Sequence, residues 1–488
     1  MLMADLHNIK IPLVGRNYEY NRMRKFLETS SSELLAVVGR RRVGKTFLIK
    51  RVYENEIAFH ITGIQDVSRK MQLDNFIYSR NNFFPKSLHF AKPTTWFEAF
   101  VQLKELLGKT AKKKRVIFFD ELPWLASGSK EFLKVFDNFW NSWAVDQNLV
   151  VVICGSSASW MITNIINNKG GLHNRVTQRI HLKPFTLLET EEFFLQQSIV
   201  MPRYSIIQVY MASGGIPFYL REVQKGDSAA QSIDRMYFGK QAALYGEFEN
   251  LYRALFKNHQ KHVEVIRALA SKWRGLTRQE LIEITSMKTG GGLSTILEEL
   301  EVSDFIHSYL PYGKKERDKL FRLSDEYSLF FLKFIEPNKN QTGYWLKNFN
   351  MPTVKAWCGY SFESLCMKHI IGIKNGLGIS GIFSREASFL KRKDNTTEGC
   401  QIDMLIDRAD NAINICEMKF YDGLYTLDAE EVRSLQQKRN VFQKSTDTRK
   451  QLFITIITTQ GLYENEHAYI ADKHLNMNVL FYQQNNQA

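Results

Sequence analysis

Long apolar runs are absent from this sequence. No segment approaches the roughly 18 consecutive apolar residues that a membrane-spanning helix needs, and residues 1–10 contain no apolar core of a secretory signal. A membrane partner is therefore not expected. We expect the protein to act in the cytoplasm.

Cysteine and acidic residues are also scarce. The five cysteines are scattered without CxxC spacing, which argues against a disulfide framework and against a zinc site. The 51 acidic residues are outnumbered by 65 lysines and arginines, so the formal net charge is +14. This balance favours a polyanionic partner, and we expect nucleic acid, DNA rather than RNA; a basic solvated surface is the alternative.

The overall composition is that of a folded protein with several domains. Hydrophobic residues make up 44% and charged residues 24% of the 488 positions, close to the averages of soluble globular proteins. A chain of this length can form about three domains, each with its own core.

A phosphate-binding loop is predicted near the N-terminus. A short apolar strand pattern leads into the sequence GRRRVGKT (residues 39–46), and a helical pattern follows. In this arrangement Gly39 and Gly44 let main-chain N–H groups face the phosphates of ATP. Lys45 is expected to reach the β- and γ-phosphates, and the Thr46 hydroxyl to bind Mg²⁺.

A second apolar strand ends in an acidic pair. Residues 115–119 run directly into Asp120 and Glu121. Asp120 is expected to hold the magnesium ion through water, and Glu121 to polarise the attacking water. The alternative is a carboxylate pair that only caps a strand or opens a helix.

Two further positions are candidates for contact with the γ-phosphate end of ATP. The strand predicted at 149–154 leads to Ser156 and Ser157, and the ends of parallel strands gather at one edge of a sheet. Either serine could sense the γ-phosphate, or form a plain turn. Arg175, with Arg179 as second choice, could enter the site of a neighbouring subunit in a homo-oligomer; a surface arginine is the alternative.

These motifs resemble the archaeal and bacterial AAA+/STAND-type P-loop ATPases of the MNS group, whose members often carry a C-terminal DUF234-like domain. Residues 13–19 look like the hhGRExE segment of that family, with a departure at Asn17, and the sequence GIP ending at Pro217 matches its GxP motif. The resemblance implies that Gly15 and Arg16 contact adenine and that Pro217 packs near it.

The middle of the chain is predicted to form a winged helix. A helical pattern at 262–270, a capping box from Thr277 to Glu280, a helix near Ser294 and a hairpin across 304–323 give three helices and a wing. Because the third helix is acidic, it suits a DNA groove poorly, and we favour a structural lid. In the DNA-reading alternative the wing loop would contact phosphates through Lys314, Lys315, Arg317 and Lys319.

The last part of the chain carries an acidic pattern on two predicted strands. Residues 400–407 and 412–420 read as a hairpin that places Asp403 beside Glu417-x-Lys419. Because side chains alternate across a strand, Glu417 and Lys419 share one face.

This pattern resembles the PD-(D/E)xK nuclease family. The resemblance implies a Mg²⁺ site at Asp403 and Glu417, with Lys419 orienting or activating water. Glu363, predicted near the start of an amphipathic helix, is where the family often has a further acidic residue. His369 is expected to be a surface residue without a partner. The basic run Lys391, Arg392 and Lys393 could contact DNA or form a solvated loop.

The sequence therefore predicts an α/β protein with an AAA+-like parallel sheet, a helical lid, a winged helix and a C-terminal α/β restriction-endonuclease-like domain. The expected bounds are 10–200, 201–257, 258–337 and 345–488. The leading hypothesis is an oligomeric ATPase that controls a Mg²⁺-dependent nuclease domain. The alternative is a STAND-like nucleotide-driven switch whose last domain binds a partner without catalysis, because a nuclease-like scaffold can lose activity.

Overall fold

The chain forms two compact units, which divide after Lys183. The computed structural model describes residues 12–108, 113–127, 130–167, 174–256, 258–287, 291–393 and 398–482. The outermost domain limits predicted from the sequence, residues 10 and 488, lie outside these ranges. The finer domain bounds remain predictions.

The first unit is built on a parallel sheet of five strands in the order β2-β3-β4-β1-β5. Nearly every residue of β1, β3 and β4 is buried, as expected for parallel strands covered on both faces. The apolar strands predicted at the phosphate loop, at the acidic pair and before Ser156 are confirmed. The strand bounds are β1 (Glu33–Val38), β2 (Ile57–Thr62), β3 (Arg115–Asp120), β4 (Leu149–Gly155) and β5 (Gln178–His181).

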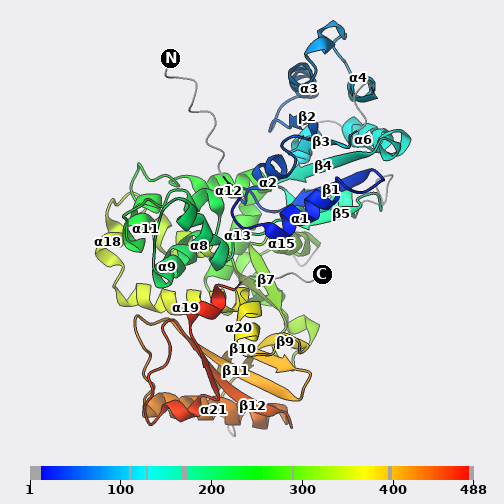
Figure 1. Cartoon of the computed structure of the whole chain (residues 1–488). Helices are drawn as coiled ribbons and strands as arrows, with labels where there is room; N and C mark the ends of the chain where they lie inside the picture. The colour runs from blue at the N-terminus through cyan, green and yellow to red at the C-terminus, as the bar shows by residue number, and fades with distance from the viewer. Residues whose placement is uncertain are drawn as a thin grey trace. The chain divides into compact units, whose positions relative to one another are not determined.

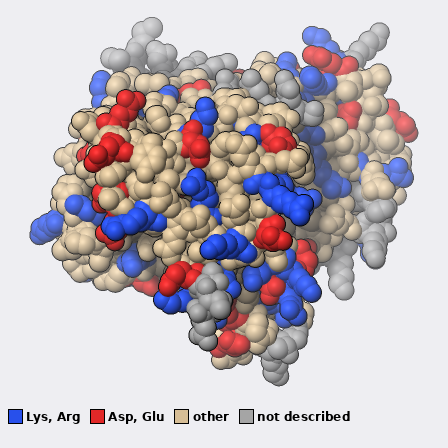
Figure 2. All heavy atoms as spheres, turned by 90° about the horizontal axis from the view of Figure 1, so that it is seen from below, with Lys and Arg blue, Asp and Glu red and all other residues tan. Residues whose placement is uncertain are grey.

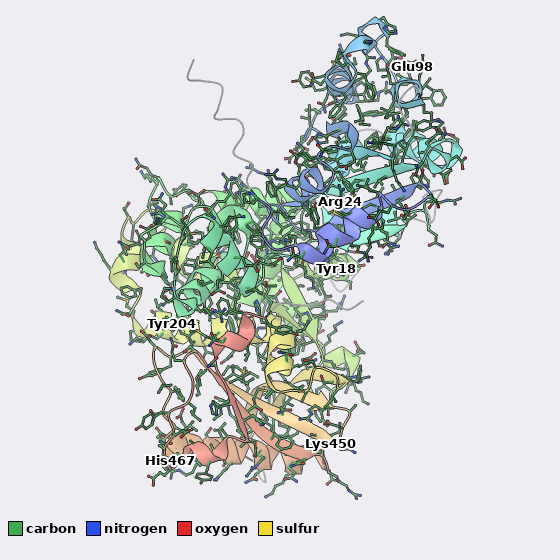
Figure 3. All side chains as sticks on the ribbon, viewed as in Figure 1. Tyr18, Arg24, Glu98, Tyr204, Lys450 and His467 are labelled. Atoms are coloured by element: carbon green, nitrogen blue, oxygen red, sulfur yellow. The ribbon has the colours of Figure 1, made fainter. Side chains whose placement is uncertain are left out.

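Aromatic packing fixes helices against this sheet. The rings of Phe100 and Phe136 lie 5.8 and 5.4 Å from Phe119 of β3. They belong to a core that joins β1–β4 to residues of five helices. The helices of this unit are α1 (Asn17–Lys25), α2 (Lys45–Val52), α3 (Arg69–Phe83), α4 (Trp96–Gly108), α5 (Leu122–Leu125), α6 (Lys130–Ser142) and α7 (Ala158–Met161). Figure 3 labels Arg24 of α1, whose guanidinium donates to the Val52 carbonyl at the end of α2 (2.9 Å).

The second unit begins with a group of helices, two of which start at capping boxes. Capping boxes at Thr186/Glu189 and Ser228/Gln231 fix two of these starts. The helices are α8 (Leu187–Gln196), α9 (Arg203–Ser213), α10 (Pro217–Leu220), α11 (Ala229–Tyr237) and α12 (Glu247–Leu255).

The helices and hairpin predicted for a winged helix are present. The Thr277/Glu280 capping box forms as expected, and three short strands pair antiparallel in the order β6-β8-β7. Two acidic side chains of the third helix form internal contacts: Glu299 pairs with His262 (2.7 Å) and Glu301 accepts from the Ser308 main-chain N–H (2.9 Å). The bounds are α13 (His259–Ala270), β6 (Leu276–Thr277), α14 (Arg278–Thr285), α15 (Gly291–Val302), β7 (Ile306–Tyr309) and β8 (Leu320–Leu323).

The last part of this unit is a mixed sheet in the order β13-β12-β11-β10-β9. β9, β10 and β11 pair antiparallel, whereas β12 runs parallel to both β11 and β13. Figure 1 shows α19 and α21 on opposite sides of this sheet. The bounds are α16 (Glu326–Phe330), α17 (Glu336–Asn338), α18 (Tyr344–Asn348), α19 (Pro352–Lys368), α20 (Ile370–Gly376), β9 (Ser384–Lys391), β10 (Cys400–Arg408), β11 (Ala412–Lys419), α21 (Ala429–Thr446), β12 (Gln451–Thr458) and β13 (Lys473–Leu475).

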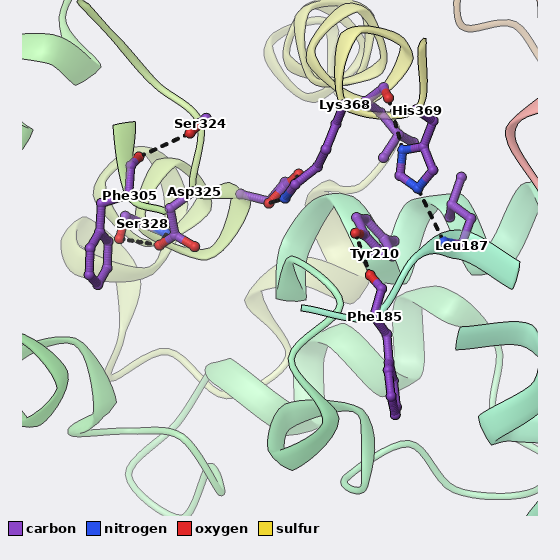
Figure 4. Close-up of polar contacts among 11 residues, drawn as sticks. Phe185, Leu187, Tyr210, Phe305, Ser324, Asp325, Ser328, Lys368 and His369 are labelled. Atoms are coloured by element: carbon purple, nitrogen blue, oxygen red, sulfur yellow. Dashed lines mark hydrogen bonds and ion pairs between the residues drawn. The ribbon is translucent and has the colours of Figure 1, made fainter. Parts of the chain in front are cut away.

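Buried polar contacts join the helices of the second unit to α19 (Figure 4). Lys368 donates to both carboxylate oxygens of buried Glu326 at 2.8 Å. His369 follows α19 and is only 6% exposed. Its Nδ1 lies 3.0 Å from the Leu365 carbonyl, and its Nε2 accepts from the Leu187 main-chain N–H at 3.1 Å. The prediction of a surface histidine without a partner is therefore wrong.

All five cysteines are free and buried, so they pack in the interior. Among the described residues, none of the helices combines the length and the apolar character that crossing a bilayer requires.

Candidate functional sites

The phosphate loop connects β1 to α2 in a conformation that requires glycine. Gly39 has φ 147° and Gly44 has φ 94°, a region that side chains with a Cβ rarely adopt. A Cβ at Gly39 would also lie 2.3 Å from the Leu182 carbonyl oxygen. Lys45, at the first position of α2, is 5% exposed, and its Nζ donates to the Gly39 and Arg40 carbonyls at 2.7 and 2.9 Å. The loop, the lysine and the helix N-terminus thus converge as predicted.

The side chains predicted to bind Mg²⁺ in this unit lie together. The Thr46 hydroxyl contacts the two carboxylate oxygens of Asp120 at 3.2 and 3.0 Å, although 74 positions separate the residues. Asp120 ends β3 and is 3% exposed. A hydroxyl and a carboxylate are hard oxygen donors, the type that Mg²⁺ prefers. These residues fit an ATP-bound magnesium ion.

Glu121 is held by the end of the neighbouring strand. It has φ 47°, an uncommon conformation for a residue with a side chain. Its Oε2 accepts from both the main-chain N–H and the hydroxyl of Ser156, at 3.0 and 2.9 Å. Burial raises the pKa of Glu121, while Lys45 and the two Ser156 donors act to lower it. The strand order explains the contact, because β4 lies between β1 and β3.

The other residues predicted for the ATP site lie at different places. Gly15 and Arg16 both have positive φ, and the buried Arg16 guanidinium donates to the Lys183 carbonyl at 2.7 Å. Arg175 is exposed. Pro217 begins α10 in the second unit. Their roles toward adenine or a neighbouring subunit stay predictions.

In the last sheet, Glu417 and Lys419 share one face, as predicted. Lys419 Nζ lies 3.2 Å from Glu417 Oε1, and both residues line one pocket with Tyr425 and Glu431. Sequence reasoning missed Lys438 of α21, whose Nζ lies 2.7 Å from Glu417 Oε2. Burial raises the pKa of Glu417, but Lys438 and Lys419 outweigh it and hold that pKa below its usual value. Nothing in the sequence around Glu417 points to Lys438, because Lys438 lies on the following helix.

Asp403 lies at an irregular point of β10. The β9–β10 register shifts between Ile402 and Leu405, and the last β10–β11 pair is Met404 with Cys416. Extending that register by one pair would place Asp403 opposite Glu417. The hydrogen bond found for the Asp403 carboxylate is from the Gln401 amide, at 2.7 Å.

Glu363 lies on α19, and the charges of Asp403 and Glu417 affect its pKa. The helix begins at Pro352, so the expectation that Glu363 is near its start is wrong: the residue lies in the C-terminal half. The Trp273 indole N–H donates to its Oε2 at 3.2 Å. Burial and the negative charge of Asp403 raise the pKa of Glu363 to about 8, while Arg322 acts to lower it.

The acids of the last domain do not form a ready metal site. Within the described ranges, no three or more His, Cys, Asp or Glu side chains are grouped so that they could hold a metal ion. Both oxygens of Glu417 are engaged by lysines, and Glu363 accepts from an indole. As arranged, Glu363, Asp403 and Glu417 do not present a complete ligand set for Mg²⁺.

Basic side chains are spread over the surface. On the face shown in Figure 2, Lys and Arg side chains occur in groups with acidic side chains between them. Lys314, Lys315 and Arg317 of the wing loop are exposed, as are Arg392 and Lys393. Lys393 pairs with Glu398 at 2.8 Å, which reduces its availability for DNA.

Comparison with known proteins identifies the phosphate-binding part. Residues 13–223 match a family described as "ATPase domain predominantly from Archaea". Over 366 residues the chain is 23% identical to the uncharacterized protein MJECL04 of Methanocaldococcus jannaschii, covering 73% of this chain and 77% of that protein. The Walker-type ATPase PABY2304 of Pyrococcus abyssi is 18% identical, with 66% of this chain and 96% of that chain covered and a TM-score of 0.50. This structural likeness concerns the fold alone.

Proposed function

Since residues 13–223 are a P-loop ATPase domain of that family, we propose that ATP hydrolysis in the first unit controls a nuclease-type centre in the last domain. The observation that carries the ATPase part is the convergence of Lys45, Thr46, Asp120 and Glu121 on one edge of the parallel sheet. DNA is the proposed substrate, and a homo-oligomer the proposed assembly.

Each residue of the ATP site has a distinct proposed task. The glycine-bounded loop binds the phosphates through main-chain N–H groups, and Lys45 contributes a positive charge. Thr46 and Asp120 would hold Mg²⁺, which neutralises charge that develops on the transferred phosphate. Glu121 orients the attacking water and accepts its proton. Arg175 is proposed to reach a neighbouring subunit.

The nuclease part rests on where the acidic residues and the lysine lie. Asp403 and Glu417 occupy adjacent antiparallel strands, and Lys419 contacts Glu417 on the same face. Glu363 contributes a third carboxylate within electrostatic reach of the other two. A lysine beside clustered carboxylates can stabilise negative charge on a phosphodiester during its hydrolysis.

A specific observation favours the rival function. Each oxygen of the Glu417 carboxylate contacts a lysine, Lys419 or Lys438, so the last domain could bind a partner without catalysis. The protein would then be a nucleotide-driven switch of the STAND type.

A cleavage assay separates the two functions. Plasmid and single-stranded DNA are incubated with the protein and Mg²⁺ or Mn²⁺, with and without ATP. We expect metal-dependent cleavage that Asp403→Ala reduces at least about a hundredfold, because the change removes a carboxylate from the reacting centre. Asp407→Ala, in the same strand, is the matched control.

Two results would count against the nuclease proposal. Cleavage that persists unchanged in Asp403→Ala would remove the assigned centre. An absence of cleavage under every condition would favour the switch.

A further inference from the structure

The winged helix touches the acidic centre of the last domain. Trp273, which follows α13, donates to Glu363 Oε2, and its ring lies 5.4 Å from that of Tyr360 on α19. In the wing loop, the Tyr312 main-chain N–H donates to the Ser388 carbonyl of β9 at 2.8 Å. The winged helix is therefore fixed to the last domain at two places.

Arg322 of β8 is buried in this contact. The residue is 6% exposed, and its guanidinium lies 4.4 Å from the centre of the Trp273 ring. Nη1 donates to the Met367 sulfur at 3.0 Å. Nε and Nη2 are buried and, within the part of the chain that the structure describes, have no hydrogen-bond partner. Buried donors without partners are unfavourable, so stability alone does not explain this arrangement.

The positive charge of Arg322 acts on the two acids of the centre. Burial lowers the pKa of Arg322, whereas Tyr309, Glu363 and Asp403, in their ionised forms, act to raise it. When these acids are ionised, the arginine thus balances part of the negative charge that would attract a divalent cation. A guanidinium and a divalent cation repel each other, so both cannot occupy this neighbourhood without a cost.

We propose that the winged helix masks the acidic centre, with Arg322, which stacks on the Trp273 ring that contacts Glu363, supplying the positive charge that a divalent cation would otherwise supply. Release of Arg322 opens the centre to the cation. This inference rests on the proposed nuclease-type centre. It also gives a reason why the predicted ligands do not form a complete set in this structure.

Binding of Mn²⁺ tests the proposal without any measurement of cleavage. Free Mn²⁺ is followed by electron paramagnetic resonance during titration of the full chain. All proteins carry Asp120→Asn, so that the phosphate loop contributes no carboxylate ligand. The variants are Arg322→Gln and the charge-retaining control Arg322→Lys. The parent and each of these variants are also combined with Asp403→Asn.

We expect Arg322→Gln to raise Mn²⁺ affinity about tenfold or more, because removal of one nearby positive charge lowers the cost of placing the cation. Arg322→Lys should bind like the parent protein, and Asp403→Asn should abolish the gain. If Arg322→Gln fails to fold, Trp273→Phe replaces it in the test. This change keeps an aromatic ring at the position but removes the N–H that donates to Glu363. It should raise the affinity several-fold by loosening the contact.

The outcomes distinguish failure of the mask from failure of the centre. If Mn²⁺ binds through Asp403 with equal affinity in the parent and in Arg322→Gln, the centre stands and the mask is overturned. Weaker binding in Arg322→Gln would make the arginine a supporting residue and also overturn the mask. If Asp403→Asn changes binding in none of the proteins, both proposals fail.

Discussion

At the scale of single residues, the pair Glu121 and Ser156 determines when the proposed base of the ATPase is charged. The two Ser156 donors favour the ionised carboxylate, whereas burial favours the protonated one. The ionised form is needed to accept a proton from water. ATP turnover should therefore fall as the pH is lowered through the pKa of Glu121.

Ser156→Ala removes the hydroxyl donor and keeps the main-chain donor. The pKa of Glu121 should rise further, and the acid limb of turnover should move up by about half a pH unit to one unit. A pH profile of steady-state ATP hydrolysis measures this shift. Glu121→Gln is the control, since it should retain nucleotide binding and lose both fast turnover and the acid limb. An acid limb that stays in place in Ser156→Ala would show that the hydroxyl does not tune the base.

The structure brings together the residues that the sequence predicted for the ATP site, and each of them is marked by its local surroundings. A glycine-bounded loop between a strand and a helix, and an acidic pair after an apolar strand, are readable within a few positions. Contacts between distant segments left no such mark. Lys438 reaches Glu417, and Arg322 reaches the Trp273 ring, only after folding. The irregularity around Asp403 depends on how β10 meets two neighbours.

At the scale of elements, contacts between distant segments also explain the wrong prediction for His369, which follows α19. A histidine at the end of a helix reads as a surface residue, because nothing in the sequence shows that another helix begins beside it. In the structure the His369 imidazole accepts from the first residue of α8. Burial lowers the pKa of His369 to about 4, so the ring is neutral in the folded protein near pH 7.

This neutral ring makes the second unit sensitive to acid. The unfolded chain takes up the His369 proton near pH 6.5, whereas the folded chain does so near pH 4. Between these values the unfolded state binds more protons, and stability falls as the pH falls. Through this one histidine, the free energy of unfolding falls by about 3 kcal/mol between these two pH values.

His369→Gln tests this contribution. The Gln amide oxygen can still accept from Leu187, but it does not titrate. We expect the variant to lose less stability than the parent between pH 6.5 and pH 4, measured as the change in thermal midpoint. His467→Gln, at a half-exposed position labelled in Figure 3, is the control and should behave like the parent. Equal losses in His369→Gln and the parent would show that His369 does not titrate on unfolding.

At the scale of the whole molecule, the two proposals combine into a dependence of cleavage on nucleotide. If ATP turnover opens the mask, a protein that cannot bind nucleotide should keep its acidic centre closed. Lys45→Ala removes the ammonium group from the phosphate loop and should abolish tight nucleotide binding. That variant should then fail to cleave DNA, even with Mn²⁺ present.

Adding Arg322→Gln to Lys45→Ala should restore cleavage, and this cleavage should no longer respond to ATP. The reason is that the positive charge near the acids is removed whether or not the first unit binds nucleotide. The double variant with Arg322→Lys is the matched control and should stay inactive. Product formation is compared with and without ATP, beside the Mn²⁺ titration of the same proteins. A double variant that binds Mn²⁺ tightly yet still needs ATP would mean that nucleotide acts on a step after the cation enters, such as placing the DNA strand.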